Sequence, residues 1–257
     1  YRNQQVKKSG FTLIELMLSM TFVSVLLLTI ALTVVQMSTT YNRGMTMKEV
    51  NQVSRDIADD LRLTVGGSSV FTVNETGNTN AYVTLRTLDD NKVVGGRLCT
   101  GVSSYIWNSS FALERNLSEV SKLENAANAA EGAGVSLYKV PDADKRYCGL
   151  SGSAPITQHI RYSDRVAGRE LLKTGDRNLG LQEFSVVSSS SAEDLGISQK
   201  MYTVNYRIGT GSTEAMNADQ TACLAPGENV DGVDKSNWTY CNIQQFTIVV
   251  RAGNATR

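Results

Sequence analysis

The feature that most constrains this chain is a run of 25 residues near its amino terminus, FTLIELMLSMTFVSVLLLTIALTVV, from Phe11 to Val35. Glu15 is the only charged residue in the run, and the next charged residue is Arg43. About 20 apolar residues are enough for a helix to cross the hydrocarbon core of a bilayer. The run therefore predicts a single membrane-spanning helix.

The residues around the run predict its orientation and bear on two simpler interpretations. Arg2, Lys7 and Lys8 precede it, and basic residues hold that end of a span in the cytoplasm, so everything past about residue 40 should lie outside. A cleaved secretory signal has an apolar stretch of about 7–15 residues followed by small residues. This run is longer and ends in QMSTTYN, without an Ala-x-Ala pattern. A plain single-span anchor explains the length and the flanks but has no use for Glu15.

Glu15 leads to a more specific interpretation, because a carboxylate inside an apolar span costs about 2.5–3.5 kcal/mol and is by default a functional site. The surrounding sequence, KKSGFTLIEL, resembles the prepilin signal of type IV pilins and type II secretion pseudopilins. The resemblance implies that a membrane peptidase cuts between Gly10 and Phe11, that the new amine of Phe11 is methylated, and that Glu15 acts in assembly. One departure is that many major pilins carry a Gly or Pro within the span, and this chain has none.

The helix should continue beyond the membrane, because apolar residues recur at steps of three and four. These residues are Met47, Val50, Val53, Ile57 and Leu61. Charged residues between them predict a polar face: Lys48, Glu49, Arg55, Asp56, Asp59, Asp60 and Arg62. Gly66 and Gly67 are a natural stop. Residues 11 to about 64 would form one helix of roughly 80 Å, with Gly44 as its weakest point. A free coiled coil is the alternative, although the pattern lasts barely two heptads.

Beyond Gly67 the hydrophobic period changes to two, which predicts strands. The expected strands are Ala81–Leu88, Val135–Val140, Ile156–Tyr162, Leu179–Val187, Lys200–Ile208 and Ile243–Arg251. Glu114–Ala130 has the spacing of one short helix. We therefore expect an α+β, pilin-like fold with an antiparallel sheet on the outer half of the long helix. The expected divisions are a leader (1–10), a transmembrane or filament-core helix (11–42), an amphipathic helix (43–66) and a β-rich head with two disulfides (67–257).

Four cysteines, Cys99, Cys148, Cys223 and Cys241, occur without a C-x-x-C motif, and the chain has one histidine, so the pattern argues against a zinc site. On the oxidising side of a membrane the cysteines should pair. Three connectivities are possible, and we expect the nearest-neighbour pairs, Cys99–Cys148 and Cys223–Cys241. The second pair looks like the carboxy-terminal disulfide-bounded loop of type IV pilins, which in that family faces outward and makes contacts. A plain covalent staple is the alternative.

The sequence offers little for catalysis. His159 alternates with apolar residues in ITQHIRY and should lie on the solvent side of a strand, and no G-x-S-x-G, H-E-x-x-H or P-loop motif is present. The acidic stretches PDADK and NVDGVDKSN could offer oxygen ligands to calcium, but neither matches an EF-hand loop, and we expect solvated turns. We predict no enzyme activity, cofactor or metal.

The resemblance implies a structural subunit of low abundance: a minor pilin of a type IV pilus, or a pseudopilin of a type II secretion or competence apparatus. NQVSRDIADDLR and the LQEFSVVS and MYTVNYRI segments look like the larger J- or W-type minor subunits. The implied partners are other pilin subunits, the prepilin peptidase and an inner-membrane assembly platform. The implied location is the bacterial inner membrane, single-pass with a cytoplasmic amino terminus, and then a periplasmic or extracellular filament.

Two alternative functions remain: a major pilin, and a tip-located subunit that binds DNA or a host surface. From Arg43 onward the chain has 22 basic and 24 acidic residues. Affinity for nucleic acid needs an excess of Lys and Arg, so this balance disfavours general DNA binding, although a local basic patch could still bind DNA.

Overall fold

A computed structural model of the chain describes residues 10–73, 81–86, 93–109, 135–143, 167–173, 178–188, 199–211, 216–217, 222–224, 229–230, 233–234 and 241–253. The chain divides into two compact units, residues 1–42 and residues 43–257, which we describe separately. Helix α1, Leu13–Gly66, supplies the helical part of the first unit and begins the second.

In the second unit, α1 runs without interruption through Gly44 to its end at Gly66, where the N–H of Gly67 donates to the carbonyl of Leu63 at 3.1 Å. The helix buries one face, as the sequence predicts. The buried residues are Thr46, Val50, Val53, Ser54, Ile57, Ala58, Leu61 and Val65. Met47 is a correction to the expected face, because it is 48% exposed.

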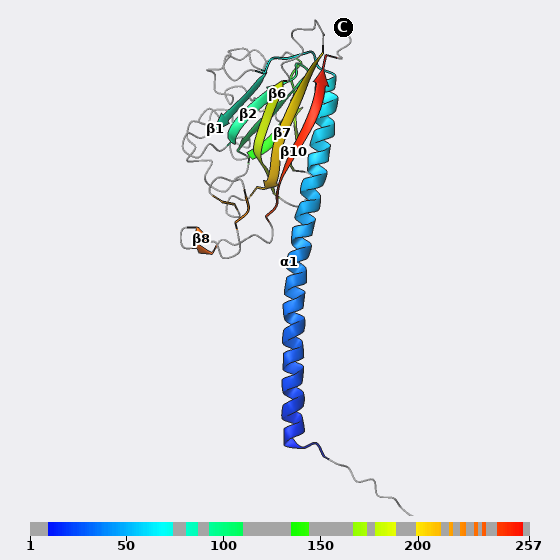
Figure 1. Ribbon diagram of the computed structural model, residues 1–257, viewed down its shortest axis with the longest axis vertical. Coiled ribbons are helices and arrows are strands. Elements are labelled where there is room, and N and C mark those ends of the chain that lie inside the picture. Colours follow the sequence, from blue (N-terminus) through cyan, green and yellow to red (C-terminus); the bar gives the residue numbers. More distant parts are fainter. Residues whose placement is uncertain are drawn as a thin grey trace, which may run out of the picture. The chain divides into compact units, whose positions relative to one another are not determined.

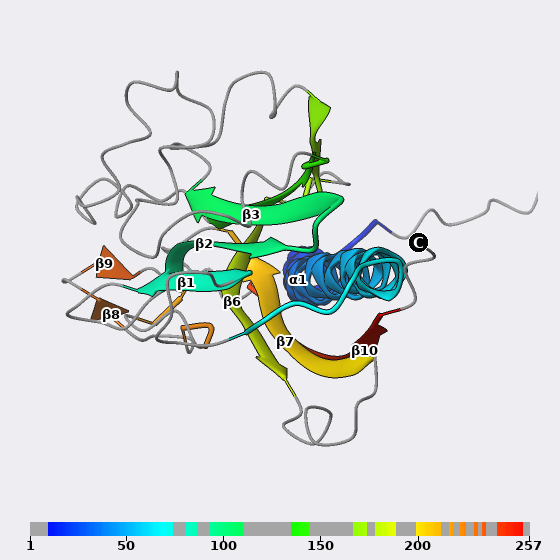
Figure 2. The ribbon, with the colours of Figure 1, turned by 90° about the horizontal axis from the view of Figure 1, so that it is seen from above.

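The strands of the second unit form antiparallel sheets (Figures 1 and 2). The five-stranded sheet follows chain order: β1 (Tyr82–Arg86), β2 (Val93–Cys99), β3 (Ser103–Ser109), β4 (Val135–Pro141) and β5 (Arg169–Glu170). The three-stranded sheet has the order β10 (Ile243–Ala252), β7 (Lys200–Thr210), β6 (Leu179–Ser188). A small pair joins β8 (Asn229–Val230) to β9 (Val233–Asp234).

The α+β layout is confirmed in its coarse form: one long amino-terminal helix followed by antiparallel sheets. Five of the six expected strands are present as β1, β4, β6, β7 and β10. The expected strand Ile156–Tyr162 and the expected helix Glu114–Ala130 lie outside the described residues. Strands β2 and β3 were missed, because VVGGRLC contains two glycines and SSYIWNS is rich in serine, and both features weaken the strand signal.

The core of the second unit forms where both main sheets meet the helix. Along β7 the residues Tyr202, Val204, Tyr206 and Ile208 are buried, whereas Met201 is 49% exposed, which is the predicted alternation. Figure 2 shows β7 and β10 curving around the helix, and the buried helix residues share one hydrophobic cluster with those of β7. The hydroxyl of Tyr206 donates a 2.7 Å hydrogen bond to the carbonyl of Ser54, which ties β7 to α1.

Asp60 departs from the expected solvent-facing polar face of the helix. Its side chain is only 14% exposed and accepts hydrogen bonds from Tyr105 at 2.7 Å and Lys139 at 3.0 Å. Arg169 of β5 adds an ion pair at 3.3 Å. The five-stranded sheet is thus attached to the helix by a carboxylate with three partners, in addition to apolar packing.

One of the two acidic stretches departs from the expected solvated turn. Asp142 of PDADK is 4% exposed and accepts a 2.7 Å hydrogen bond from the hydroxyl of Ser104. The burial of Asp142 corrects the expectation of a plain solvent-exposed turn for PDADK. In the NVDGVDKSN stretch, β8 and β9 pair antiparallel, and the expectation of a solvated turn there stays a prediction.

Candidate functional site

The site begins at the first turn of α1, where Thr12 and Glu15 form a capping box. The N–H and the hydroxyl of Thr12 both donate to Glu15 Oε2 at 3.0 Å, and the N–H of Glu15 donates to the Thr12 hydroxyl at 3.3 Å. This exchange satisfies two N–H groups that a helix start leaves without intrahelical partners. The T-x-x-E signature was present in the sequence and could have predicted this helix start.

The capping box uses only one oxygen of Glu15. Both bonds from Thr12 end at Oε2, and Oε1 has no hydrogen-bond partner within the described part of the chain. A carboxylate carries about four acceptor positions, so the side chain keeps the capacity to bind a further donor. Its negative charge also lies at the positive end of the helix dipole.

The other polar side chains of the apolar stretch are satisfied within the helix. The hydroxyls of Ser19, Thr21, Ser24, Thr29 and Thr33 each donate to a carbonyl three or four residues earlier, at 2.8–3.1 Å. Such bonds allow a hydroxyl to face lipid without an unmet donor. Glu15 is therefore the polar side chain of residues 13–35 that retains an unused hydrogen-bonding atom.

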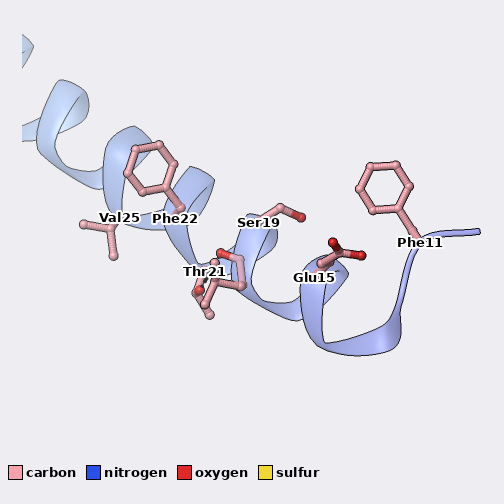
Figure 3. A pocket seen from close by; sticks show the side chains of 7 residues that line it. Phe11, Glu15, Ser19, Thr21, Phe22 and Val25 are labelled. Carbon is pink, nitrogen blue, oxygen red and sulfur yellow. Dashed lines mark hydrogen bonds between the residues drawn. The ribbon is translucent and has the colours of Figure 1, made fainter. Parts of the chain in front are cut away.

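Residues 13–38 of the helix in the first unit are all exposed. By length and composition it could cross a membrane, and none of its most apolar 18-residue window is buried. Phe11 is 86% exposed and Gly10 is exposed, so the Gly10–Phe11 bond is open to solvent in this structure. Figure 3 shows Glu15 on the first turn beside Phe11, with Ser19, Phe22 and Val25 following along the helix. An open groove runs between these side chains.

The cysteines lie in the second unit. Cys223 and Cys241 form a disulfide with a sequence separation of 18 residues, which agrees with the expected nearest-neighbour pair. Cys99 is also disulfide-bonded, and its expected partner Cys148 lies outside the described residues. Cys241 is two residues before β10 and packs in a small cluster with Met216 and Ile243.

Among the described residues, neither a metal site nor a catalytic centre is supported. Within the described ranges, no group of three or more His, Cys, Asp or Glu side chains is placed to hold a metal ion. His159 lies outside those ranges. The candidate site is accordingly the exposed apolar helix with Gly10, Phe11 and Glu15 at its beginning.

Comparisons with protein-family models, with curated proteins and with solved structures found no match for this chain.

Proposed function

We propose that this chain is a low-abundance structural subunit of a type IV pilus or of a type II secretion or competence pseudopilus. A peptidase cuts between Gly10 and Phe11, the apolar helix holds the subunit in the inner membrane, and the head lies outside. The subunit then joins a filament through that helix, with its neighbours as the partners.

One observation carries the proposal: a carboxylate with an unused oxygen sits on the first turn of an exposed apolar helix, directly after the Gly10–Phe11 bond. Cutting that bond would create a positive amine close to Glu15. A charge left alone among apolar helices is costly, whereas a charge-assisted hydrogen bond is strong. Glu15 of an arriving subunit can therefore bind an amine of a subunit already in the assembly and set the axial register.

The capping box makes a precise test possible, because the cap and the charge can be removed separately. Glu15→Gln keeps a side chain that a capping box accepts but removes the charge. Thr12→Ala removes the cap but keeps the charge, and Glu15→Val removes both. We expect all three variants to insert into the membrane and to be cut after Gly10, which intact mass would show as a chain that starts at Phe11.

Incorporation into sheared filaments, measured by immunoblot against the membrane-bound pool, should fall sharply in Glu15→Gln and Glu15→Val. It should stay close to the wild-type level in Thr12→Ala. Normal incorporation of Glu15→Gln would refute the role of the charge. A native protein that retains residues 1–10 would refute the family assignment itself.

A further inference from the structure

The three-stranded sheet ends in an unusually regular edge. Strand β10 pairs with β7 over all ten residues, Ile243–Ala252, without a register shift. The other described edges of the two main sheets are shorter or interrupted: β5 has two residues, whereas β1 and β6 each contain a register shift. Proteins usually interrupt, shorten or charge an edge strand, because its unpaired backbone groups attract another strand.

The register shows which backbone groups of β10 point away from β7. The N–H of Thr210 donates to the carbonyl of Asn242, so this pair is hydrogen-bonded, and every second pair along the ladder must be hydrogen-bonded too. The even-numbered residues of β10 therefore bond to β7. The odd-numbered residues direct their N–H and C=O groups to the open edge.

Two further hydrogen bonds agree with this assignment. The N–H of Gly211 donates to the carbonyl of Asn178 at 2.7 Å, which places the odd-numbered residues of β7 against β6 and leaves its even-numbered ones for β10. The N–H of Gly253 donates to the carbonyl of Ser68 at 2.9 Å, so an odd-numbered position beyond β10 already binds backbone at the same edge.

The open part of the edge consists of Gln245, Thr247 and Val249. All three are exposed, Val249 by 53%, and none of their outward backbone groups has a partner among the described residues. No proline or charge interrupts the edge between Ile243 and Val250. Arg251 follows, exposed and without an acidic partner in the described part of the chain.

We propose that an extended segment of a neighbouring subunit adds as a strand along Gln245, Thr247 and Val249, with an acidic residue that reaches the side chain of Arg251. The added strand ends before Arg251, because the carbonyl of Arg251 faces the end of α1 at Gly66. Backbone hydrogen bonds supply the affinity, and the acid that pairs with Arg251 sets the register. A second copy of β10 fits less well, because its sequence IQQFTIVVRA contains no acid to meet Arg251. This inference rests on the proposed function, since the partner is another subunit of the assembly.

Amide hydrogen exchange provides the test, because β10 contains its own control. In the full chain in detergent, the amides of Gln245, Thr247 and Val249 should exchange quickly, whereas those of Phe246 and Ile248 are protected by β7. In assembled filaments the odd-numbered amides should slow by at least about tenfold, and the even-numbered ones should change little. Fast odd-numbered amides in filaments that contain the subunit would overturn this inference and leave the proposed function intact. Absence of the subunit from filaments would overturn both.

Two substitutions at Thr247 separate the effect of its backbone N–H from the effect of its side chain. Thr247→Pro removes an N–H that the ladder does not use, and proline is tolerated on such an edge. Thr247→Val removes the side-chain bond to Asn205 but keeps the N–H. Incorporation should fall several-fold in Thr247→Pro and stay near wild type in Thr247→Val. If the two variants are incorporated equally, and the odd-numbered amides of β10 exchange quickly in the filaments of both, strand addition is rejected.

Discussion

The hydroxyl of Tyr105 donates a 2.7 Å hydrogen bond to Asp60 Oδ2, and this contact joins strand β3 to helix α1. Lys139 approaches the other oxygen of the same carboxylate at 3.0 Å and also donates to the hydroxyl of Thr64 at 2.7 Å. Asp60 is therefore the point at which the five-stranded sheet is attached to the helix by polar contacts.

Removal of this carboxylate should destabilise the head. In Asp60→Ala the fully buried Tyr105 and the mostly buried Lys139 lose the carboxylate as an acceptor, and Lys139 loses its counter-charge, which should cost about 2–4 kcal/mol of unfolding free energy. Asp59→Ala is the matched control, because the Asp59–Arg62 ion pair is exposed and should contribute less than about 1 kcal/mol. Denaturant unfolding of the full chain in detergent measures both, and similar losses in the two variants would contradict the role of Asp60.

The stability of the head should fall at alkaline pH because of buried tyrosines. Burial raises the pKa of Tyr206 to about 12, whereas an unfolded tyrosine titrates near pH 10. Between about pH 10 and pH 12 the unfolded chain releases this proton and the folded chain keeps it, so stability is lost as pH rises through that window. One tyrosine contributes at most about 1.4 kcal/mol per pH unit.

Tyr206→Phe should make that alkaline loss shallower, although it also removes the bond to the carbonyl of Ser54 and lowers stability at neutral pH. Burial raises the pKa of Tyr105 and of Tyr202 in the same direction, so part of the pH dependence should remain. The measurement is the unfolding free energy between pH 8 and pH 12. An unchanged slope in Tyr206→Phe would show that Tyr206 ionises equally easily in both states.

Gly96 should tolerate no side chain, because a Cβ there would lie 2.1 Å from Cζ2 of Trp107. Trp107 is fully buried and packs on Phe184 at a ring distance of 4.7 Å, so it has little room to move. We expect Gly96→Ala to destabilise the head by about 1–3 kcal/mol. Gly44→Ala is the control: a Cβ there meets nothing within 4 Å, and alanine in a helix is favoured by up to about 1 kcal/mol. Thermal unfolding that lowers the midpoint for both variants alike would contradict the Trp107 contact.

Local sequence patterns predicted which segments form the helix and most strands, but they did not predict which distant residues those segments contact. The period-two alternation of β7 and β10 was correct because each strand has one buried and one exposed face, and the helix periodicity correctly placed Val50, Val53, Ile57 and Leu61 in the core. Strand β2 was missed because of its glycines, and Gly96 is required by the ring of Trp107 in β3, a contact between two strands that no local propensity contains.

The sequence by itself determined the apolar helix, the position of Glu15 near its start and the change from helical to strand periodicity, because each depends on residues close together in the chain. Only the tertiary structure decided that Asp60 and Asp142 are buried, that Met47 is exposed and that no other described strand pairs with the outer edge of β10. Those outcomes depend on which side chains and strands from distant parts of the sequence come close to these residues. An acidic residue is buried where tyrosine, lysine or serine donors from other strands reach it, and a strand edge stays open where no other strand of the fold pairs with it.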